Sequence, residues 1–403
     1  MIFREITKDE YIKFWNNHPN KFFLSSYEIT KLRKKSGWDY YIVGIEEKNK
    51  IIAASIIYIK KKFLKYSEAY SPRGYLLDYK NIELVDFFTK NLIKFLKSKN
   101  VFIFRTDPYI IYQERDIDGN IVENGINNET FLNKLKSYGF KRIDPKYEEQ
   151  VSWMFSLDLD KTSDEILKNM RQNTRNTIRK TEKIGINLKE LKKEELDLFY
   201  NILKETGERK DFKVRDISYY KDMYDLFSKD IKFFITELDL DKYIDNLLNE
   251  KKELEEKVNK LSKKNKGQIN EINSQINTLD KKINEAKEII KKENKSVINL
   301  SASMFILIKP EIVYLSSGNY EEYLKFNSQY LIQWELIKYG IKNGYKKHNF
   351  YGIPANINTH PKDYGIYEFK KGFNGYVEEL IGELELPVNN FYYIYKFLKK
   401  IKK

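Results

Sequence analysis

Short runs of hydrophobic residues, either continuous or alternating with polar ones, recur along most of the chain. Runs typical of β-strands occur at residues 40–45, 51–59, 101–107, 232–238, 301–308 and 311–318. Apolar positions at three-four spacing, typical of helices, occur at residues 83–98, 128–139, 162–183 and 320–343. The mixture predicts an α+β fold. The two halves also share a crude order of helices, an antiparallel meander, and then a strand and a helix, which suggests a duplication.

Residues 241–293 have a different pattern, with apolar residues repeating in two heptad seams. The first seam contains Ile244, Leu247, Leu254, Val258 and Leu261, and the second contains Ile269, Ile272, Ile276, Leu279, Ile283, Ala286 and Ile290. Lys251 interrupts the first seam, and Gly267 lies in a polar stretch that suits a reversal of the chain. The pattern predicts an antiparallel coiled-coil hairpin. Its basic and acidic residues nearly balance, which favours a solvated surface over an RNA-binding one.

The hairpin interrupts a predicted pair of strands, so we interpret it as an insertion. We expect a first domain at residues 1–155, a second domain at 156–240 and 294–403, and the arm at 241–293 between the two parts. The C-terminal helix should return to the first domain. Antiparallel α/β units with amphipathic helices favour the fold of the acetyltransferase (GNAT) superfamily, and thus two GNAT domains.

Composition narrows the possible chemistry. The 403 residues contain no Cys, which excludes disulfides, thiolate zinc sites and a cysteine nucleophile. The three His are too scattered for a local metal motif, so we expect no metal and no bound cofactor. No apolar stretch approaches the roughly 20 residues that a membrane span needs. We therefore expect a cytoplasmic protein.

The formal net charge of +14 indicates a polyanionic partner, although the excess of Lys, Asn, Ile and Tyr also fits an AT-rich coding bias. Four cations recur at four-residue spacing within the predicted helix at 162–183, which starts with a capping-box pattern. They are Arg171, Arg175, Arg179 and Lys183. This stripe is either a solvated helix face or a contact for phosphate or RNA.

Other charged positions can also be interpreted as either functional or structural. Residues 208–224 interleave cations with aromatic residues, which suits either a nucleotide site or an ordinary surface loop. Arg73 follows a predicted strand, and Arg105 and Asp107 lie at the end of one, where they could line a cleft or pair with one another. Lys370 lies in an aromatic segment that we expect to be a strand, from which a cation could stabilise an oxyanion. No pyrophosphate loop of acyl-CoA enzymes, Walker A motif, GxSxG or HExxH motif occurs.

Several motifs in order resemble the FemABX aminoacyltransferases, which build peptidoglycan interpeptide bridges. They are SPRGYLLDY (71–79), RTDPY (105–109), RNTIRKTEKIGI (175–186), ERKDFKVRD (208–216), YLIQWELIKYGIKNGYKKHNFYGI (330–353) and FKKGFNGYVEELIGELELP (369–387). The resemblance covers essentially the whole chain, and the heptad insertion is similar to the helical arm of the FemA and FemB branch.

The resemblance implies transfer of Gly, Ser or Ala from aminoacyl-tRNA, as co-substrate, to the stem peptide of a lipid-linked or UDP-linked muramyl peptide. It implies contacts with the acceptor's phosphate and sugar at Arg33, ahead of Trp38, and at Arg215. It also draws attention to Asp107 and Lys370 as the groups that support transfer. We add Arg73 and Tyr219 to the candidate acceptor contacts and assign the cation stripe to tRNA or phosphate.

An aminoacyl ester is already activated, so the protein need only align the reactants, remove a proton and stabilise the oxyanion. Two alternatives stay open, an acyl-CoA-dependent N-acyltransferase and a non-catalytic coiled-coil interaction protein. We also expect peripheral association with the inner face of the plasma membrane through the precursor, and a homologous partner held through the arm.

Overall fold

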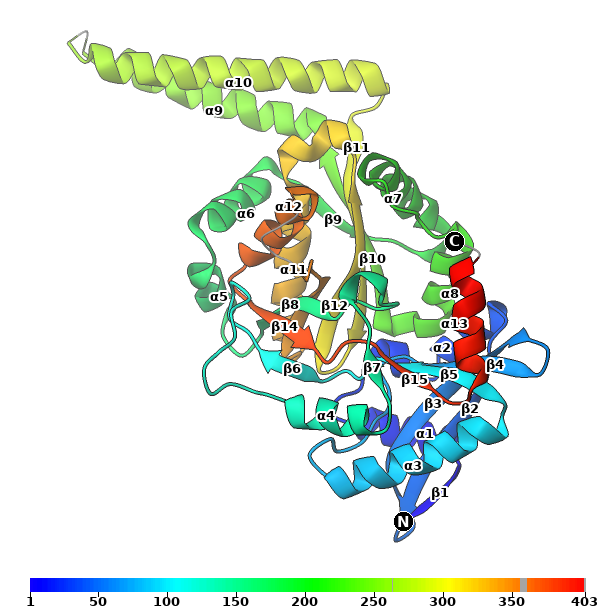
Figure 1. Cartoon of the computed structure of the whole chain (residues 1–403). Coiled ribbons are helices and arrows are strands. Elements are labelled where there is room, and N and C mark those ends of the chain that lie inside the picture. The colour runs from blue at the N-terminus through cyan, green and yellow to red at the C-terminus, as the bar shows by residue number, and fades with distance from the viewer. Residues whose placement is uncertain (263, 356–360, 402–403) are drawn as a thin grey trace. The chain divides into compact units, whose positions relative to one another are not determined.

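The computed structural model describes residues 1–262, 264–355 and 361–401, and contacts divide the chain into two compact units (Figure 1). Unit 1 consists of Met1–Asp158, Ile308–Val313 and the residues from Lys346 onward. Unit 2 consists of Leu159–Leu307 and Tyr314–Tyr345. The last part of the chain thus packs with the first. The domain boundaries expected above follow the order of elements along the chain, whereas these units follow contacts, so those boundaries stay a prediction.

A sheet with the strand order β1-β2-β3-β4-β5-β15-β7 forms the centre of unit 1. The strands are β1 (Ile2–Glu5), β2 (Asp39–Glu47), β3 (Lys50–Phe63), β4 (Tyr66–Ser71), β5 (Val101–Thr106), β15 (Leu384–Pro387) and β7 (Lys141–Arg142). β1 to β4 pair antiparallel in chain order, whereas β4 and β5 pair in parallel. A parallel pair needs a crossover, and α3 (Ile82–Ser98) provides it, with its apolar face in the core of the unit.

A second ladder of unit 1 runs in the order β6-β14-β8-β13 and ends on residues 311–313 of β12. Its strands are β6 (Ile111–Glu114), β14 (Tyr376–Leu380), β8 (Trp153–Asp158) and β13 (Lys347–Gly352). The remaining helices of the unit are α1 (Lys8–Asn17), α2 (Ile29–Lys35), α4 (Glu129–Ser137), α12 (Pro361–Lys371) and α13 (Phe391–Ile401). Gly375 immediately precedes β14 and lies close to β8. A Cβ on this residue would lie 2.0 Å from the Ser156 carbonyl oxygen, so only glycine fits.

Unit 2 continues from β12 with the strand order β12-β11-β10-β9. Its strands are β9 (Asn187–Glu190), β10 (Ile231–Asp239), β11 (Val297–Ile308) and β12 (Glu311–Asn319), the last of which begins in unit 1. Its helices are α5 (Ser163–Asn169), α6 (Gln172–Ile184), α7 (Leu196–Lys210), α8 (Ile217–Phe227), α9 (Leu240–Lys260), α10 (Lys266–Glu293) and α11 (Ser328–Lys342). The predicted strand pair flanking the insertion is confirmed, because β10 and β11 pair antiparallel.

The same succession of elements occurs twice. β4 pairs in parallel with β5 after α3, and β12 pairs in parallel with β13 after α11. In both places the strands that come before are antiparallel neighbours in chain order, β1 to β4 in one and β9 to β11 in the other. The repeated topology is what a duplicated α+β module produces.

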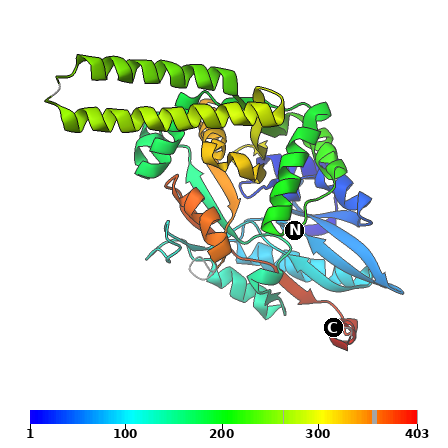
Figure 2. The same cartoon turned by 90° about the horizontal axis from the view of Figure 1, so that it is seen from above.

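Helices α9 and α10 form the predicted hairpin of unit 2 and lie side by side, antiparallel (Figures 1 and 2). Leu247, Leu279 and Ile283 of the predicted seams are buried between them. Lys251, which interrupts the first seam, has its Nζ 2.6 Å from Asp280 Oδ1 on the facing helix. An interhelical ion pair therefore occupies the position where the heptad pattern lacks an apolar residue.

Three local predictions are wrong. The helix predicted at 162–183 is broken into α5 and α6 at Met170, whose side chain is buried and whose backbone is extended. The helix predicted at 320–343 begins as a 3-10 turn (Glu321–Phe326) and restarts after Asn327, which has a φ of 53°. The segment around Lys370, predicted as a strand, is the end of helix α12. The capping box of Thr162 and Glu165 is confirmed.

Candidate active site

A buried ion pair joins Arg73 and Asp107 in unit 1. Because β4 and β5 are parallel, the loops that follow them lie at one edge of the sheet and bring these residues together. Arg73 Nη1 lies 3.3 Å from Asp107 Oδ2, and each side chain is 1% exposed. The Tyr70 hydroxyl and the Arg73 backbone N–H both donate to Asp107 Oδ1, at 2.8 and 3.1 Å. Burial raises the pKa of Asp107 to about 6, although Arg73 and these donors oppose the rise.

Arg33 lies among aromatic rings in the same unit. Its guanidinium carbon is 5.2 Å from the ring centre of Tyr70 and 6.0 Å from that of Trp38. Its Nη2 donates to Glu149 Oε1 at 2.7 Å. Arg33 thus makes a cation–π contact with Trp38, and their predicted contact with the acceptor stays a prediction. Tyr70 also connects them to Asp107, since its ring contacts Arg33 and its hydroxyl contacts the carboxylate.

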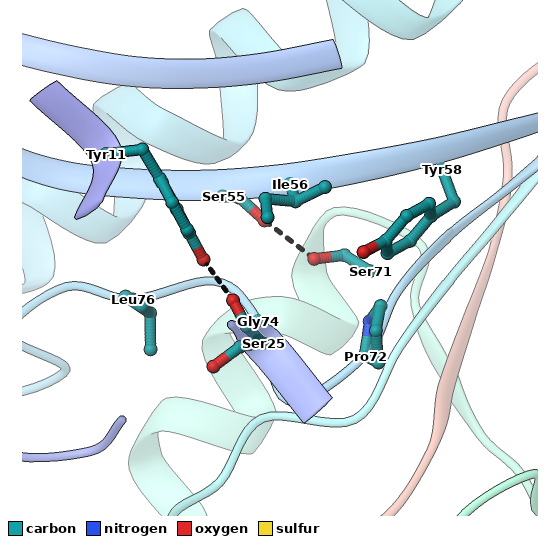
Figure 3. Close-up of a pocket in the computed structure, with 9 residues that line it drawn as sticks. All are labelled: Tyr11, Ser25, Ser55, Ile56, Tyr58, Ser71, Pro72, Gly74 and Leu76. Atoms are coloured by element: carbon teal, nitrogen blue, oxygen red, sulfur yellow. Dashed lines mark hydrogen bonds between the residues drawn. The ribbon is translucent and has the colours of Figure 1, made fainter. Parts of the chain in front are cut away.

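A small crevice lined by hydroxyl groups lies beside the Arg73 loop (Figure 3). Its lining residues are Tyr11, Ser25, Ser55, Ile56, Tyr58, Ser71, Pro72, Gly74 and Leu76. Within it the Ser55 and Ser71 hydroxyls are 2.6 Å apart, and a Cβ on Gly74 would lie 2.2 Å from Ser71 Oγ. The Tyr58 hydroxyl is buried with no hydrogen-bond partner among the described residues, and Arg33 lies 5.8 Å from its ring centre. A side chain at position 74 would therefore force the hydrogen-bonded Ser55 and Ser71 hydroxyls to move.

Lys370 is buried at the end of α12, with 4% of the residue exposed. Its Nζ donates to the Gly352 carbonyl oxygen at 2.5 Å and to that of Tyr351 at 3.4 Å. Burial lowers the pKa of this amine from its ordinary value of 10.5 to about 7. Gly352 packs against Val151, whose carbonyl accepts from Arg73 Nη2 at 2.7 Å. A chain of contacts thus links Lys370 with the Arg73–Asp107 pair.

Unit 1 contains a second buried polar cluster that was not predicted from the sequence. Lys347 Nζ lies 3.3 Å from Glu311 Oε2 and 3.0 Å from Glu378 Oε1, and it also donates to the Tyr109 hydroxyl. Asn349 donates to Glu311 at 3.1 Å. These residues come from strands far apart in the sequence, so no local pattern could have indicated the cluster.

Glu383 is also missing from the predicted site. Its side chain is fully buried, one oxygen accepts from the Glu149 backbone N–H at 2.6 Å, and Oε1 has no hydrogen-bond partner among the described residues. Burial raises its pKa to about 7 and the charge of Asp107 adds to the rise, although the Glu149 N–H and Arg105 Nη1, which lies 3.6 Å from Oε1, oppose it. Arg105 pairs with Glu385 at 2.8 Å rather than with Asp107. The alternation of Glu and Leu in GELELP was the available signal, but it could not show that both faces of this strand are buried.

The other candidates lie in unit 2. Arg215 is exposed ahead of α8, and its guanidinium carbon is 4.7 Å from the ring centre of Tyr219. Asp216 caps that helix through the Ser218 backbone N–H at 2.9 Å. The adjacent Arg209 donates to the Asn319 carbonyl, while two of its other nitrogens are buried without partners among the described residues. Arg215, just ahead of α8, and Tyr219 in its first turn thus form one contact pair.

The predicted cation stripe is interrupted at its start, because the chain breaks ahead of α6, and only Arg175, Arg179 and Lys183 lie four residues apart on that helix. Arg171 is the residue that precedes α6, and Arg175 Nη1 donates to the Lys168 and Met170 carbonyl oxygens at 2.7 and 2.5 Å. Arg175 therefore caps the end of α5, which is a structural role. Lys183 Nζ pairs with Glu250 Oε2 on α9 at 2.8 Å. Arg179 is exposed.

Two features are absent from the part of the chain that the structure describes. No group of three or more His, Asp or Glu side chains is placed there to hold a metal ion. No helix in residues 1–262, 264–355 and 361–401 is long and apolar enough to cross a bilayer.

Comparisons with known proteins define the class of the fold. The crystal structure of FemX matches with a TM-score of 0.77 and 24% identity, covering 99% of this chain and 100% of that one. A tandem GNAT protein from the clavulanic acid biosynthesis pathway matches with a TM-score of 0.50 and 8% identity, covering 96% and 98% of the two chains. The fold is thus that of proteins with two acetyltransferase-like modules, as the sequence predicts.

Sequence comparison then gives the family. The FemAB family model matches residues 6–400. A curated relative, "Aminoacyltransferase FemA" of Staphylococcus epidermidis, is 31% identical over 420 residues, and the alignment covers 100% of both chains. The chain belongs to the FemAB family.

Proposed function

We propose that this protein transfers an amino acid, Gly, Ser or Ala, from aminoacyl-tRNA to the stem peptide of a peptidoglycan precursor. The observation that carries the proposal is the full-length similarity to the aminoacyltransferase FemA. The structure is compatible with it because Arg33, Asp107 and Lys370 are connected through contacts within one unit.

The chemistry needs little from the protein. The acceptor amine attacks the ester carbonyl, a C–N bond forms, and the C–O bond to the terminal ribose of the tRNA breaks. The proton lost by the amine leaves with the ribose oxygen, so no oxidant or covalent intermediate is required. The protein contributes alignment and a charge that stabilises the oxyanion.

In this proposal Lys370 supplies that charge. With a pKa lowered to about 7, its amine exchanges readily between the charged and neutral forms near neutral pH. The two backbone carbonyls that accept from Nζ hold it in place and leave one of its three N–H groups for the substrate. Asp107, whose carboxylate is buried, acts through Arg73 and Tyr70 by fixing their positions.

The remaining candidates bind anionic substrates. Arg33 and Trp38, together with Arg73, are proposed to hold the phosphate and sugar of the acceptor, and Arg215 with Tyr219 to add a second contact. Arg171, Arg179 and Lys183 are proposed to meet tRNA or phosphate. For Arg175 we propose at most an indirect part, because two backbone carbonyls already use its guanidinium.

The proposed setting is the cytoplasm, at the inner face of the plasma membrane, with the acceptor either lipid-linked or UDP-linked. The protein would use aminoacyl-tRNA as co-substrate and no bound cofactor. The α9–α10 hairpin is proposed to hold a homologous partner. Deletion of residues 242–292 tests that role, because transfer should survive while the complex is lost.

The decisive experiment mixes the purified protein with charged tRNAs and purified precursor and measures the mass of the product. The expected result is a mass increase of one amino-acid residue that depends on intact tRNA. Labelled acetyl-CoA, supplied in place of tRNA, should not be incorporated. A folded protein that produces no amide from tRNA, or that acylates from acetyl-CoA, would disprove the proposal.

A further inference from the structure

The C-terminal helix α13 presents hydrophobic side chains to the surface. Tyr393 is 60% exposed, Ile394 56%, Phe397 64% and Leu398 47%. On a helix these positions lie one turn apart and form a continuous stripe. Single exposed apolar residues are normal on protein surfaces, but a grouped set marks an interaction site.

This stripe is not the face that attaches the helix to unit 1. Attachment uses the opposite side, where Tyr392 is buried against Phe102 and Ile103 and its hydroxyl donates to Glu385 at 2.7 Å. Phe391 and Tyr395 pack around the same cluster. The helix is therefore apolar on two sides, and only one of them is covered within the described residues.

The tip of the β3–β4 hairpin extends the apolar surface. Phe63 is 52% exposed and Leu64 is 74% exposed. Phe63 stacks on Phe391 of α13 with ring centres 5.8 Å apart, and Tyr66 stacks on the same ring at 4.1 Å. Both views place α13 beside this hairpin (Figures 1 and 2). We call the six exposed residues of the two elements the apolar patch: Phe63, Leu64, Tyr393, Ile394, Phe397 and Leu398.

Lysines surround the apolar patch. The tip has the sequence KKKFLKY at 60–66, in which Lys61 and Lys65 are exposed and have no carboxylate partner among the described residues. The carboxylates of Glu68 and Glu385 in this region are already paired, Glu68 with Lys62 at 2.9 Å and Glu385 with Lys396 at 2.9 Å. The charge around the patch is thus strongly positive.

We propose that the apolar patch and its lysines form a docking site for an anionic lipid bilayer. Aromatic and aliphatic side chains enter the boundary between headgroups and acyl chains, while lysines remain at the level of the anionic headgroups. The carboxylates of an acidic protein surface would pair with the lysines. The apolar patch would then contact polar groups instead of an apolar environment. The site contacts lipid directly and works without any precursor, so it stands independently of the proposed function.

The test is vesicle flotation of the full-length protein without substrate. One set of vesicles contains phosphatidylcholine alone, and the other contains phosphatidylcholine mixed with phosphatidylglycerol. The variants are Leu64→Ser/Phe397→Ser and Lys61→Gln/Lys65→Gln. Matched controls on the arm are Leu248→Ser, whose side chain is 46% exposed, and Lys252→Gln/Lys257→Gln. Thermal unfolding verifies that every variant keeps its fold.

The wild-type protein should float with the phosphatidylglycerol vesicles and stay behind with phosphatidylcholine alone. Leu64→Ser/Phe397→Ser should lower the partition coefficient at least about tenfold, because two apolar side chains no longer enter the bilayer. Lys61→Gln/Lys65→Gln should lower it about fivefold per lysine, and salt should reduce this difference. The arm controls should bind like the wild type.

Three results would overturn the proposal. The wild type could fail to bind either vesicle, or the patch variants could bind as well as the arm controls. In the third case, sedimentation would detect a dimer that Leu64→Ser/Phe397→Ser abolishes without any vesicle binding, which would assign the patch to a second copy of this chain.

Discussion

Arg73 and Asp107 lie 34 residues apart in the sequence, yet they form an ion pair in which each side chain is only 1% exposed. Desolvation of two charges is costly, and the pair is held because the carboxylate also accepts from Tyr70 and from the Arg73 backbone. Such an arrangement fixes the loop after β4 more firmly than packing alone. It also gives the first test of the candidate site.

We expect Asp107→Asn to destabilise the protein by about 3 kcal/mol, because the Arg73 charge would remain buried without a counter-charge. Urea unfolding at pH 8, where the wild-type carboxylate is ionised, measures the effect. Asp160→Asn is the matched control, since Asp160 is exposed. If Asp107→Asn lowers the free energy of unfolding by less than about 1 kcal/mol, the pair stabilises the protein no more than a surface ion pair does.

Lys370→Met should abolish transfer without unfolding the protein, because a flexible apolar side chain replaces a buried amine. The neighbouring Lys371→Met is the control, as Lys371 pairs with exposed Asp118 and should be dispensable. Circular dichroism and turnover under the same conditions separate folding from function. Normal turnover of Lys370→Met would remove the proposed role.

The lowered pKa of Lys370 also predicts a pH effect on stability. Between pH of about 7 and 10 the unfolded chain holds a proton on this amine that the folded chain lacks, so stability should rise with pH across this window. Lys370→Met should lack that part of the rise. Urea midpoints of the two proteins at several pH values give the difference, and parallel curves would contradict the shift.

Glu383 should show the opposite dependence. Its pKa is raised to about 7, so the folded protein favours the protonated carboxyl and loses stability as pH rises through that value. Glu383→Gln mimics the protonated form and should remove most of the loss between about pH 5 and 8. Glu129→Gln, at an exposed position, serves as the control. If the wild type and Glu383→Gln lose stability equally, Glu383 is not the group that titrates.

Arg33 offers a kinetic test. Arg33→Ala should raise the KM for the precursor about tenfold to a hundredfold with little change in kcat, since a charge-assisted contact contributes about 1.5–3 kcal/mol. Arg33→Lys should recover part of the loss, because it keeps the charge but not the planar group that faces Trp38 and Tyr70. Arg4→Ala controls for charge alone. An unchanged KM in Arg33→Ala would reject the contact.

The arm allows a comparison between an apolar position of one seam and an ionic position of the other. Ile283→Ala should cost about 3 kcal/mol, because Ile283 is 4% exposed and its loss leaves a cavity. Lys251→Leu should change stability by less than about 1 kcal/mol, because the pair with Asp280 is partly exposed. Thermal unfolding of both variants tests the ranking, and a larger effect at Lys251 would reverse it.

The sequence predicts what depends on local periodicity. The strands at 51–59 and 301–308 and the two helices of the arm follow from repeats of two and seven residues, and the structure contains them. The break at Met170 was not visible, because the apolar and basic positions stay in register across it and the interruption depends on a backbone turn capped by Arg175.

The contacts of the candidate site are tertiary, which limits how much of the site can be predicted from the sequence. Alternation around Lys370 resembled a strand, but Tyr367 and Lys370 are both buried, three residues apart, which is the spacing of one helix face. The partner of Asp107 could not be inferred either, since the nearby Arg105 was an equally good candidate by position. Parallel pairing of β4 with β5 selects Arg73, and that pairing is not encoded in any local pattern.

Strand β15 lies between β5 and β7, although it comes from the last part of the chain. During synthesis β5 emerges long before β15, and its edge stays open while all of unit 2 is made. An open edge of this kind invites pairing with other nascent chains. The first sheet can close only after unit 2 has been synthesised, so residues 101–106 keep an unpaired strand edge until then.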